Sequence, residues 1–120
     1  MENQEILDRF GKLLIDNIYN DALKHFNAIR SGTTKWNIGK EYTEVLDKLT
    51  DDEKDILFKY IKESLSTSIF SFLQIFEENP EFKIIFESEN GRQIDLNRIS
   101  EMLKSEHHGE DGWIQKFGIE

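Results

Sequence analysis

The chain has 120 residues, no cysteine and a formal net charge of −9, with 24 acidic side chains against 15 lysines and arginines. This length suits one domain, so residues 1–120 are expected to fold as a single unit with its own core. The absence of cysteine excludes disulfides, a thiol nucleophile and cysteine-ligated zinc, and no quarter of the chain is net basic, which argues against nucleic-acid binding.

The chain also lacks membrane and export signals. No stretch approaches the ~20 apolar residues that span a bilayer, and the start, Met-Glu-Asn-Gln-Glu, lacks the basic and apolar regions of a signal peptide. We therefore expect a cytoplasmic protein without a membrane partner. The surplus of carboxylates would attract a basic protein at low salt, or it would simply keep a small domain soluble.

The first element predicted is a long amphipathic helix from Glu2 to Arg30. Its apolar residues recur mostly at three- and four-residue steps, as one helix face requires, at positions Leu7, Phe10, Leu14, Ile18, Ala22 and Ile29, with Leu13, Leu23 and Phe26 widening the stripe. Ser31-Gly32 supplies its end. Gly11 lowers the helix propensity by about 1 kcal/mol relative to alanine, or it lets another backbone approach closely.

A polar loop over 31–40, which carries Trp36, leads to a short helix from about Glu41 to Leu49. Its apolar face is expected to hold Tyr42, Val45, Leu46 and Leu49. Thr50-Asp-Asp-Glu53 then fits a capping box, in which the Thr hydroxyl and the Glu carboxylate each accept a hydrogen bond from a backbone N–H. The helix that starts there is predicted to run to about Glu78, before Asn79-Pro80. Its apolar face is expected to hold Leu57, Tyr60, Ile61, Leu65, Ile69, Phe72, Leu73 and Phe76.

After Pro80 the apolar period becomes two, and Asn90-Gly91 is a turn signal, so we expect a short antiparallel hairpin near 82–96. Asp95 or Asn97 then caps a last short helix that carries Ile99, Met102 and Leu103. The fold class expected is mainly α (α+β). It combines two long helices, one or two short ones, the small hairpin and a docked aromatic tail.

The C-terminal segment 105–117 is unusual for a tail because it carries Trp113 and Phe117, four residues apart. Undocked tails are usually polar, so these aromatics are expected to pin the tail to the helices. Trp36 and Trp113 are the candidate anchors of a protein interface, with Phe117, Glu110 and Asp111 beside them. The alternative is that each tryptophan fills the edge of a small core.

The same tail suggests a metal site as a second possibility. His107, His108, Glu110 and Asp111 are all capable ligands, and a divalent ion there could activate water for hydrolysis. Adjacent histidines diverge on a regular backbone, however, and the spacing matches no helical ligand pattern. The simpler interpretation is a solvated acidic turn, with no metal and no cofactor.

Polar residues of the first helix have an equally simple interpretation. His25 is expected at the boundary of the core rather than as a catalytic base. The other polar side chains of this helix are those of Asp16, Asn17, Asn20 and Asp21. They could bind a cation or a basic side chain, but a solvent-exposed helix face is sufficient to explain them.

No catalytic residue is predicted, since the chain contains no Gly-x-Ser-x-Gly, no phosphate-binding glycine loop and no calcium loop. Three functions remain. The first is an acidic protein-binding module, such as an immunity-type inhibitor of a basic toxin. The second is a metal-assisted hydrolase, and the third is a structural or regulatory homodimer.

The ending Gly109-Glu-Asp-Gly-Trp-Ile-Gln-Lys-Phe117, with Ile94-Asp-Leu-Asn-Arg-Ile-Ser100 before it, resembles that of a group of small, uncharacterised bacterial proteins. These close with a similar Glu-Asp-Gly-Trp-Ile-x-x-Phe signature, and the resemblance covers the last third of the chain. It implies a bacterial origin and a structural role for the signature. It implies no activity, cofactor or site.

Overall fold

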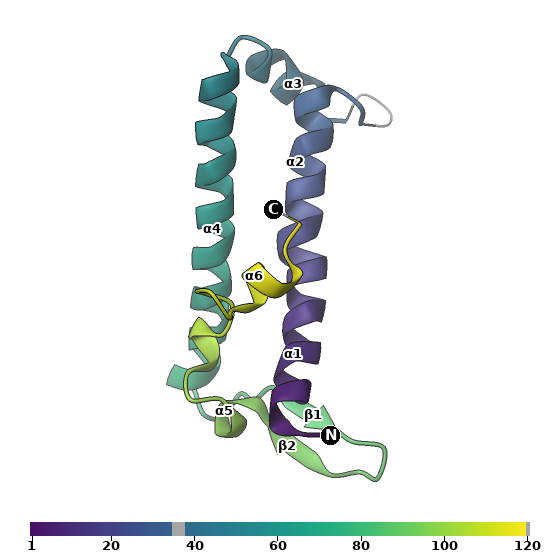
Figure 1. The fold of residues 1–120 in the computed structure, drawn as a ribbon, viewed down its shortest axis with the longest axis vertical. Helices are drawn as coiled ribbons and strands as arrows, with labels where there is room; N and C mark the ends of the chain where they lie inside the picture. Colours follow the sequence, from purple (N-terminus) through teal and green to yellow (C-terminus); the bar gives the residue numbers. More distant parts are fainter. Residues whose placement is uncertain (35–37, 120) are drawn as a thin grey trace.

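Two long antiparallel helical arms form the body of the molecule (Figure 1). The computed structural model describes residues 1–34 and 38–119. The first arm consists of α1 (Asn3–Leu14), a π-helical segment (Ile15–Asn20) and α2 (Asp21–Ser31), which follow one another without a break. Gly32 ends this arm in the left-handed conformation, with φ of 69°, at the end that its sequence predicts.

The second arm is α4 (Asp51–Glu78), which runs back beside the first. Its start is the capping box that the sequence predicts: Thr50 accepts a hydrogen bond from the Glu53 N–H at 3.1 Å, and Glu53 accepts one from the Thr50 N–H at 2.8 Å. A short helix, α3 (Lys40–Leu46), joins the arms. Neither arm, nor any other helix of the described residues, is both long and apolar enough to span a membrane.

The predicted hairpin is confirmed at the other end of the molecule. Strands β1 (Ile85–Glu87) and β2 (Gln93–Asp95) pair antiparallel, with Phe86 opposite Ile94. Asp95 caps α5 (Leu96–Ile99) by accepting from the Asn97 N–H at 3.0 Å. The last predicted helix is shorter than expected, because α5 ends at Ile99 and a separate 3-10 turn (Leu103–Ser105) follows Met102.

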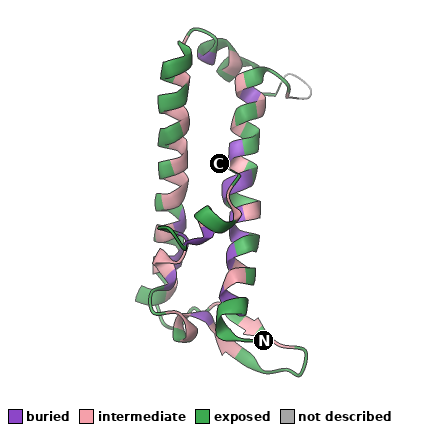
Figure 2. Ribbon diagram, viewed as in Figure 1, coloured by how far each residue is buried: buried purple, intermediate pink, exposed green. Residues whose placement is uncertain are grey.

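The aromatic tail is docked, as predicted. Helix α6 (Trp113–Phe117) lies across the two arms, about midway along them (Figure 1). The core therefore gathers where tail, arms and hairpin meet (Figure 2). Its buried residues come from all of these elements: Ile6, Leu7, Leu14, Ile15, Tyr19, Leu23, Ile69, Leu73, Leu96, Leu103 and Trp113.

The half of the molecule beyond the tail has a thin core. There α2 and α4 meet through the stacked rings of Phe26 and Phe58, with centroids 5.5 Å apart, and the 3.2 Å ion pair of Arg30 with Asp55. The molecule is consequently elongated, with principal extents of 53 × 27 × 26 Å and a radius of gyration of 17.4 Å. A compact chain of this length has a radius of gyration of about 14 Å.

Candidate functional site

The tail residues predicted as interface anchors are structural. Trp113 is 1% exposed; its ring makes an edge contact with Phe10, with centroids 5.9 Å apart. Phe117 is half-buried against the same core. The prediction of Trp113 as an accessible anchor is therefore wrong, because the indole fills the space between the arms. Trp36, the other predicted anchor, lies outside the described residues.

The tail is also tied to the first arm by a polar clasp that sequence reasoning placed on the solvent side. Asn20 is 3% exposed; its side-chain Nδ2 donates to the Phe117 carbonyl at 2.9 Å, and its Oδ1 accepts from the Ile119 N–H at 3.0 Å. The Asn20 side chain thus satisfies two backbone groups of the tail that would otherwise face the helix without partners.

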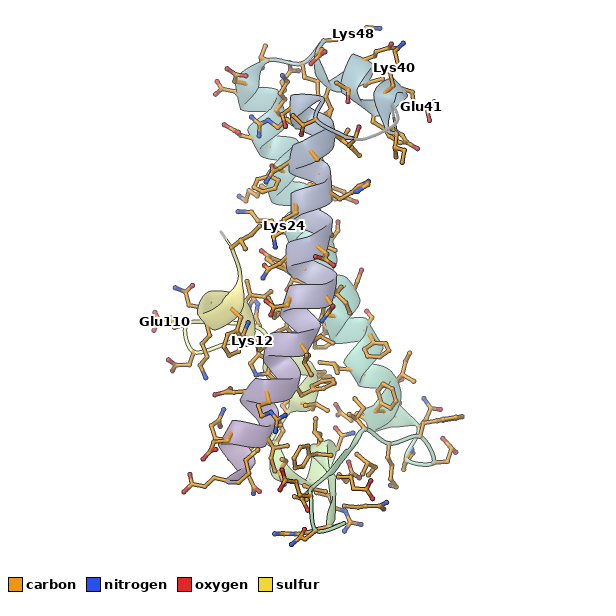
Figure 3. The ribbon with its side chains drawn as sticks, turned by 90° about the vertical axis from the view of Figure 1, so that its right-hand side faces the viewer. Lys12, Lys24, Lys40, Glu41, Lys48 and Glu110 are labelled. Atoms are coloured by element: carbon orange, nitrogen blue, oxygen red, sulfur yellow. The ribbon has the colours of Figure 1, made fainter. Side chains whose placement is uncertain are left out.

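The four residues of the possible metal site do not converge. His107 is 2% exposed and points toward α4, where its Nε2 lies 2.9 Å from the Ser66 carbonyl oxygen. His108, Glu110 and Asp111 are exposed, and Glu110 projects from the outer edge of the tail turn (Figure 3). Within residues 1–34 and 38–119, no three His, Asp or Glu side chains lie close enough to hold a metal. The side chains of the segment that joins the 3-10 turn to α6 therefore point in different directions.

The environment of His107 favours the neutral imidazole. Burial, with a smaller contribution from the charge of His108, lowers the pKa of His107 below its ordinary value of 6.5, and the carbonyls of Ser66 and Lys104 oppose this effect without overcoming it. Since a carbonyl only accepts hydrogen bonds, the proton of the neutral ring sits on Nε2. His107 therefore serves as a buried hydrogen-bond donor that holds the tail to α4.

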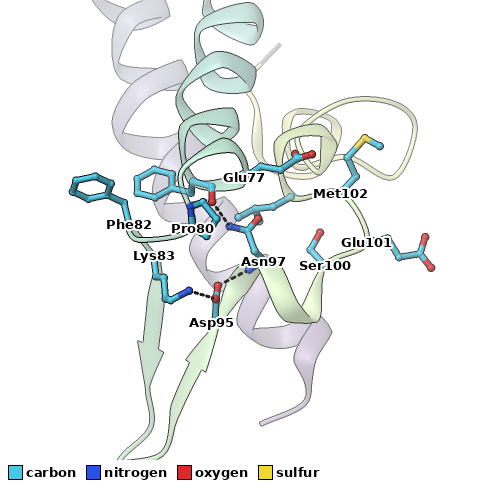
Figure 4. Close-up of a pocket in the computed structure, with 11 residues that line it drawn as sticks. Glu77, Pro80, Phe82, Lys83, Asp95, Asn97, Ser100, Glu101 and Met102 are labelled. Carbon is cyan, nitrogen blue, oxygen red and sulfur yellow. Dashed lines mark hydrogen bonds and ion pairs between the residues drawn. The ribbon is translucent and has the colours of Figure 1, made fainter.

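A shallow depression of about 270 Å³ lies where α4, the hairpin and α5 meet (Figure 4). Its polar side chains are already engaged in holding this junction. Lys83 lies 3.7 Å from Asp95, which caps α5, and Asn97 donates to the Phe76 carbonyl at 3.4 Å. Glu77, on the rim, pairs with Lys104 at 3.3 Å. Ser100, which also lines the depression, donates its hydroxyl to the Glu106 carboxylate, so this side chain too holds the junction together. We therefore assign the depression a structural role.

The end of the molecule opposite the hairpin, formed by residues 38–60 and called the distal end below, has a different character. It displays large side chains to solvent: Tyr42 is 58% exposed, Val45 59%, Ile56 70% and Tyr60 66%. The first two lie on α3 and the last two on the outer side of α4. Each pair is spaced by three or four residues, so each forms a small stripe on its helix.

Carboxylates outnumber basic side chains in the sequence near these residues. The segment 40–55 carries seven Asp and Glu residues against three lysines. Lys40 and Glu41 project from α3, and Lys48 from the turn that follows (Figure 3). In the part of the chain that the structure describes, no ion pair engages the carboxylates of Glu41, Asp47, Asp51, Asp52. Apolar anchors within a charged rim are the usual anatomy of a protein interface.

Sequence reasoning missed the distal end because it assigned Tyr42, Val45 and Tyr60 to buried helix faces. One sequence signal could have revealed the exposed residues: the apolar residues of α4 extend around more than one face of the helix. Ile56, Tyr60, Phe72 and Ile69 cannot share one face of a helix, so some of them had to face solvent.

The chain matches no protein-family model, no curated protein and no solved structure.

Proposed function

We propose that this protein is an acidic protein-binding module whose distal end holds a basic partner protein in the cytoplasm, as an immunity-type inhibitor holds a toxin. The observation that carries the proposal is the exposure of Tyr42, Val45, Ile56 and Tyr60 in an acidic segment, several of whose carboxylates form no ion pair within the described residues. Tyrosine is among the residues on which interfaces concentrate their binding energy, since its ring buries much area and its hydroxyl finds a polar partner.

Two features of the molecule support this proposal, the first for the choice of this end and the second for a basic partner. The tail, the hairpin and the core occupy the other half, so a partner at the distal end would disturb none of them. The net charge of −9 would also accelerate the approach of a basic protein, because complementary charge raises association rates at low salt.

The test uses a purified basic protein encoded beside the gene for this chain. Binding is measured by calorimetry and by association kinetics over a range of salt concentrations. Tyr42→Ser should weaken binding at least about 10-fold, mainly through faster dissociation, because it removes an anchor. Combining Glu41→Gln with Asp47→Asn should slow association and reduce its dependence on salt, because steering charges are removed.

The matched control combines Glu2→Gln with Glu5→Gln, which removes the same charge from the opposite end of the molecule. This variant should keep both the affinity and most of the salt dependence. Equal effects from the two charge variants would show that the net charge alone acts. An unchanged affinity of Tyr42→Ser would reject the distal end as the binding surface.

A further inference from the structure

Helix α4 carries a second line of residues that the core covers only in part: Ser68, Phe72 and Ile75 are exposed, while Ile61, against the core, and Ser64 are half-buried. Ile61, Ser64, Ser68, Phe72 and Ile75, called the α4 stripe below, recur at three- and four-residue steps, so they share one helix face. Phe72 is 44% exposed and Ile75 47%, whereas Ile69 and Leu73, which point into the core, are 2% and 0% exposed. The α4 stripe is thus an apolar face with small residues at its centre.

The centre of this face is free of charge. Segment 64–76 contains no Asp, Glu, Lys or Arg, in a chain of which 32% is charged. This segment therefore lacks the acidic surplus that would attract a basic partner to the distal end. It also lacks the like-charge repulsion that would oppose a second copy of the same chain.

The molecule as a whole exposes more surface than a chain of its mass needs. A compact monomer of 14.2 kDa has about 6,800 Å² of accessible surface, whereas this chain exposes 8468 Å². The excess is about 1,700 Å². Each partner of a standard stable interface buries about 800 Å². This excess is distributed over the whole elongated molecule, and it is larger than the area that each chain of a standard dimer buries.

The spacing within the α4 stripe is symmetrical. Ile61, Ser64, Ser68, Phe72 and Ile75 are separated by 3, 4, 4 and 3 residues, so the pattern is the same in both directions from Ser68. It also repeats every 11 residues, a period that keeps a stripe on one side of a nearly straight helix. Two identical stripes of this kind therefore match residue for residue when their helices lie antiparallel.

We propose that two copies of this chain form a dimer in which the α4 helices pair antiparallel along the α4 stripe, with the two-fold axis at Ser68. In this register Ser64 of one copy lies opposite Phe72 of the other, so a large ring enters the space beside a small residue. Ile61 lies opposite Ile75, and the two Ser68 residues meet on the axis. Small residues at the centre let the helices approach closely.

The dimer goes beyond the proposed function and does not depend on it. Asp51, where α4 begins, is 17 residues from Ser68, or about 26 Å along the helix. Antiparallel pairing would therefore hold the two distal ends about 50 Å apart, facing opposite ways. Each copy would keep its own distal end accessible, and a dimer could hold two partner molecules.

Cysteine cross-linking of the full chain tests the register directly, since the chain contains no cysteine of its own. Ser68→Cys should form a disulfide-linked dimer rapidly under mild oxidation, because its Cα atom meets its own copy within bridging distance. Ser64→Cys, one turn away on the same stripe, should not cross-link to itself. A mixture of the Ser64→Cys and Phe72→Cys chains should form the mixed dimer. Glu63→Cys, exposed on the side of α4 that faces away from the stripe, is the control for random collision.

Sedimentation tests the association itself. The unaltered chain should sediment with twice its chain mass at micromolar concentration, and Phe72→Ser combined with Ile75→Ser should return it to one chain mass with its helical circular dichroism unchanged. If that variant unfolds, the cysteine result decides alone. A monomer up to millimolar concentration overturns the proposal. Equally fast cross-linking at positions 64 and 68 would indicate parallel helices and overturns it as well.

Discussion

The indole ring of Trp113 lies directly over Gly11 in α1, so close that a Cβ atom at position 11 would overlap the ring. Both residues are buried, and the contact joins the tail to the start of the first arm. A helix normally loses stability through an internal glycine. Here the missing side chain provides the space that lets the largest side chain of the tail reach the core.

Gly11→Ala should therefore destabilise the protein, although alanine is the better helix former. Overpacking costs typically about 1–3 kcal/mol, which outweighs the gain of up to about 1 kcal/mol in helix propensity. Urea unfolding measures the change. In a Trp113→Ala background the ring is absent, so Gly11→Ala should become neutral or stabilising there. The same loss in both backgrounds would show that the ring is not the cause.

The burial of His107 predicts a stability that depends on pH near neutrality. Because the folded-state pKa of His107 lies below its ordinary value of 6.5, the unfolded chain binds the proton more readily than the folded one. Its contribution to stability is therefore complete above pH 6.5. It decreases as the pH falls from there through the folded-state pKa.

His107→Gln removes this titration and leaves an amide that can donate to the Ser66 carbonyl. The free energy of unfolding of the natural chain should fall between pH 7.5 and pH 5.5, and this fall should shrink in the variant. The exposed neighbour offers the control His108→Gln. Because the charge of His108 is one of the smaller causes that lower the His107 pKa, this variant should keep most of the natural pH dependence. If both variants lose the pH dependence, His107 is not the group responsible.

The parts of this fold that local sequence signals encode could be predicted. The capping box at Thr50, the stop at Gly32 and the turn before Gln93 each depend on residues a few positions apart, and the structure has all three elements. The docking of the tail was predictable for another reason, since a tryptophan near a chain end has little other way to leave water.

Contacts between residues far apart in the sequence could not be predicted. Gly11 meets Trp113 across about a hundred residues, and Asn20 meets Phe117 across 97. Nothing local distinguishes Asn20, which is buried, from Asn17, which is exposed. The π-helical segment that includes both residues has no pattern signal either. The tail decides which polar residue of the first arm is covered.

Thr50→Ala should lower stability by about 1 kcal/mol, as expected for the loss of an N-cap. The change removes the hydroxyl that accepts from the Glu53 N–H, and α4 would begin to fray at its first turn. Thr50→Ser keeps this hydroxyl and should be close to neutral. Thermal unfolding compares the two. A loss of similar size in both variants would implicate the methyl group of threonine instead of the cap.

The partner of Thr50 in the capping box adds a dependence on acid. The backbone N–H of Thr50 donates to the Glu53 carboxylate and thereby holds the pKa of Glu53 below its ordinary value of 4.5. Its stabilising contribution is present above that value and is lost as the pH falls through the folded-state pKa. Glu53→Gln should flatten the stability profile below pH 4.5, with no effect on the component assigned to His107.

Asn20→Asp should release the tail without unfolding the arms. Aspartate can still accept from the Ile119 N–H, but it cannot donate to the Phe117 carbonyl, and it would place a second carboxylate beside Asp16, to which Asn20 Nδ2 also donates at 3.2 Å. A buried group left without its partner costs about 1–3 kcal/mol. We expect the tail to detach before the arms unfold, because the carbonyl and the N–H that Asn20 binds both belong to the tail.

Hydrogen exchange followed by peptide separates local release from global loss. In Asn20→Asp the amides of segment 113–119 should exchange faster, while those of α4 near Ile69 should keep most of their protection. Asn17→Asp makes the same chemical change three residues earlier, where the side chain is exposed and donates only to Leu13 of its own helix. It should leave the tail protected. Uniform loss of protection in Asn20→Asp would mean that tail and arms unfold together. The arms would then depend on the docked tail to stay packed against each other.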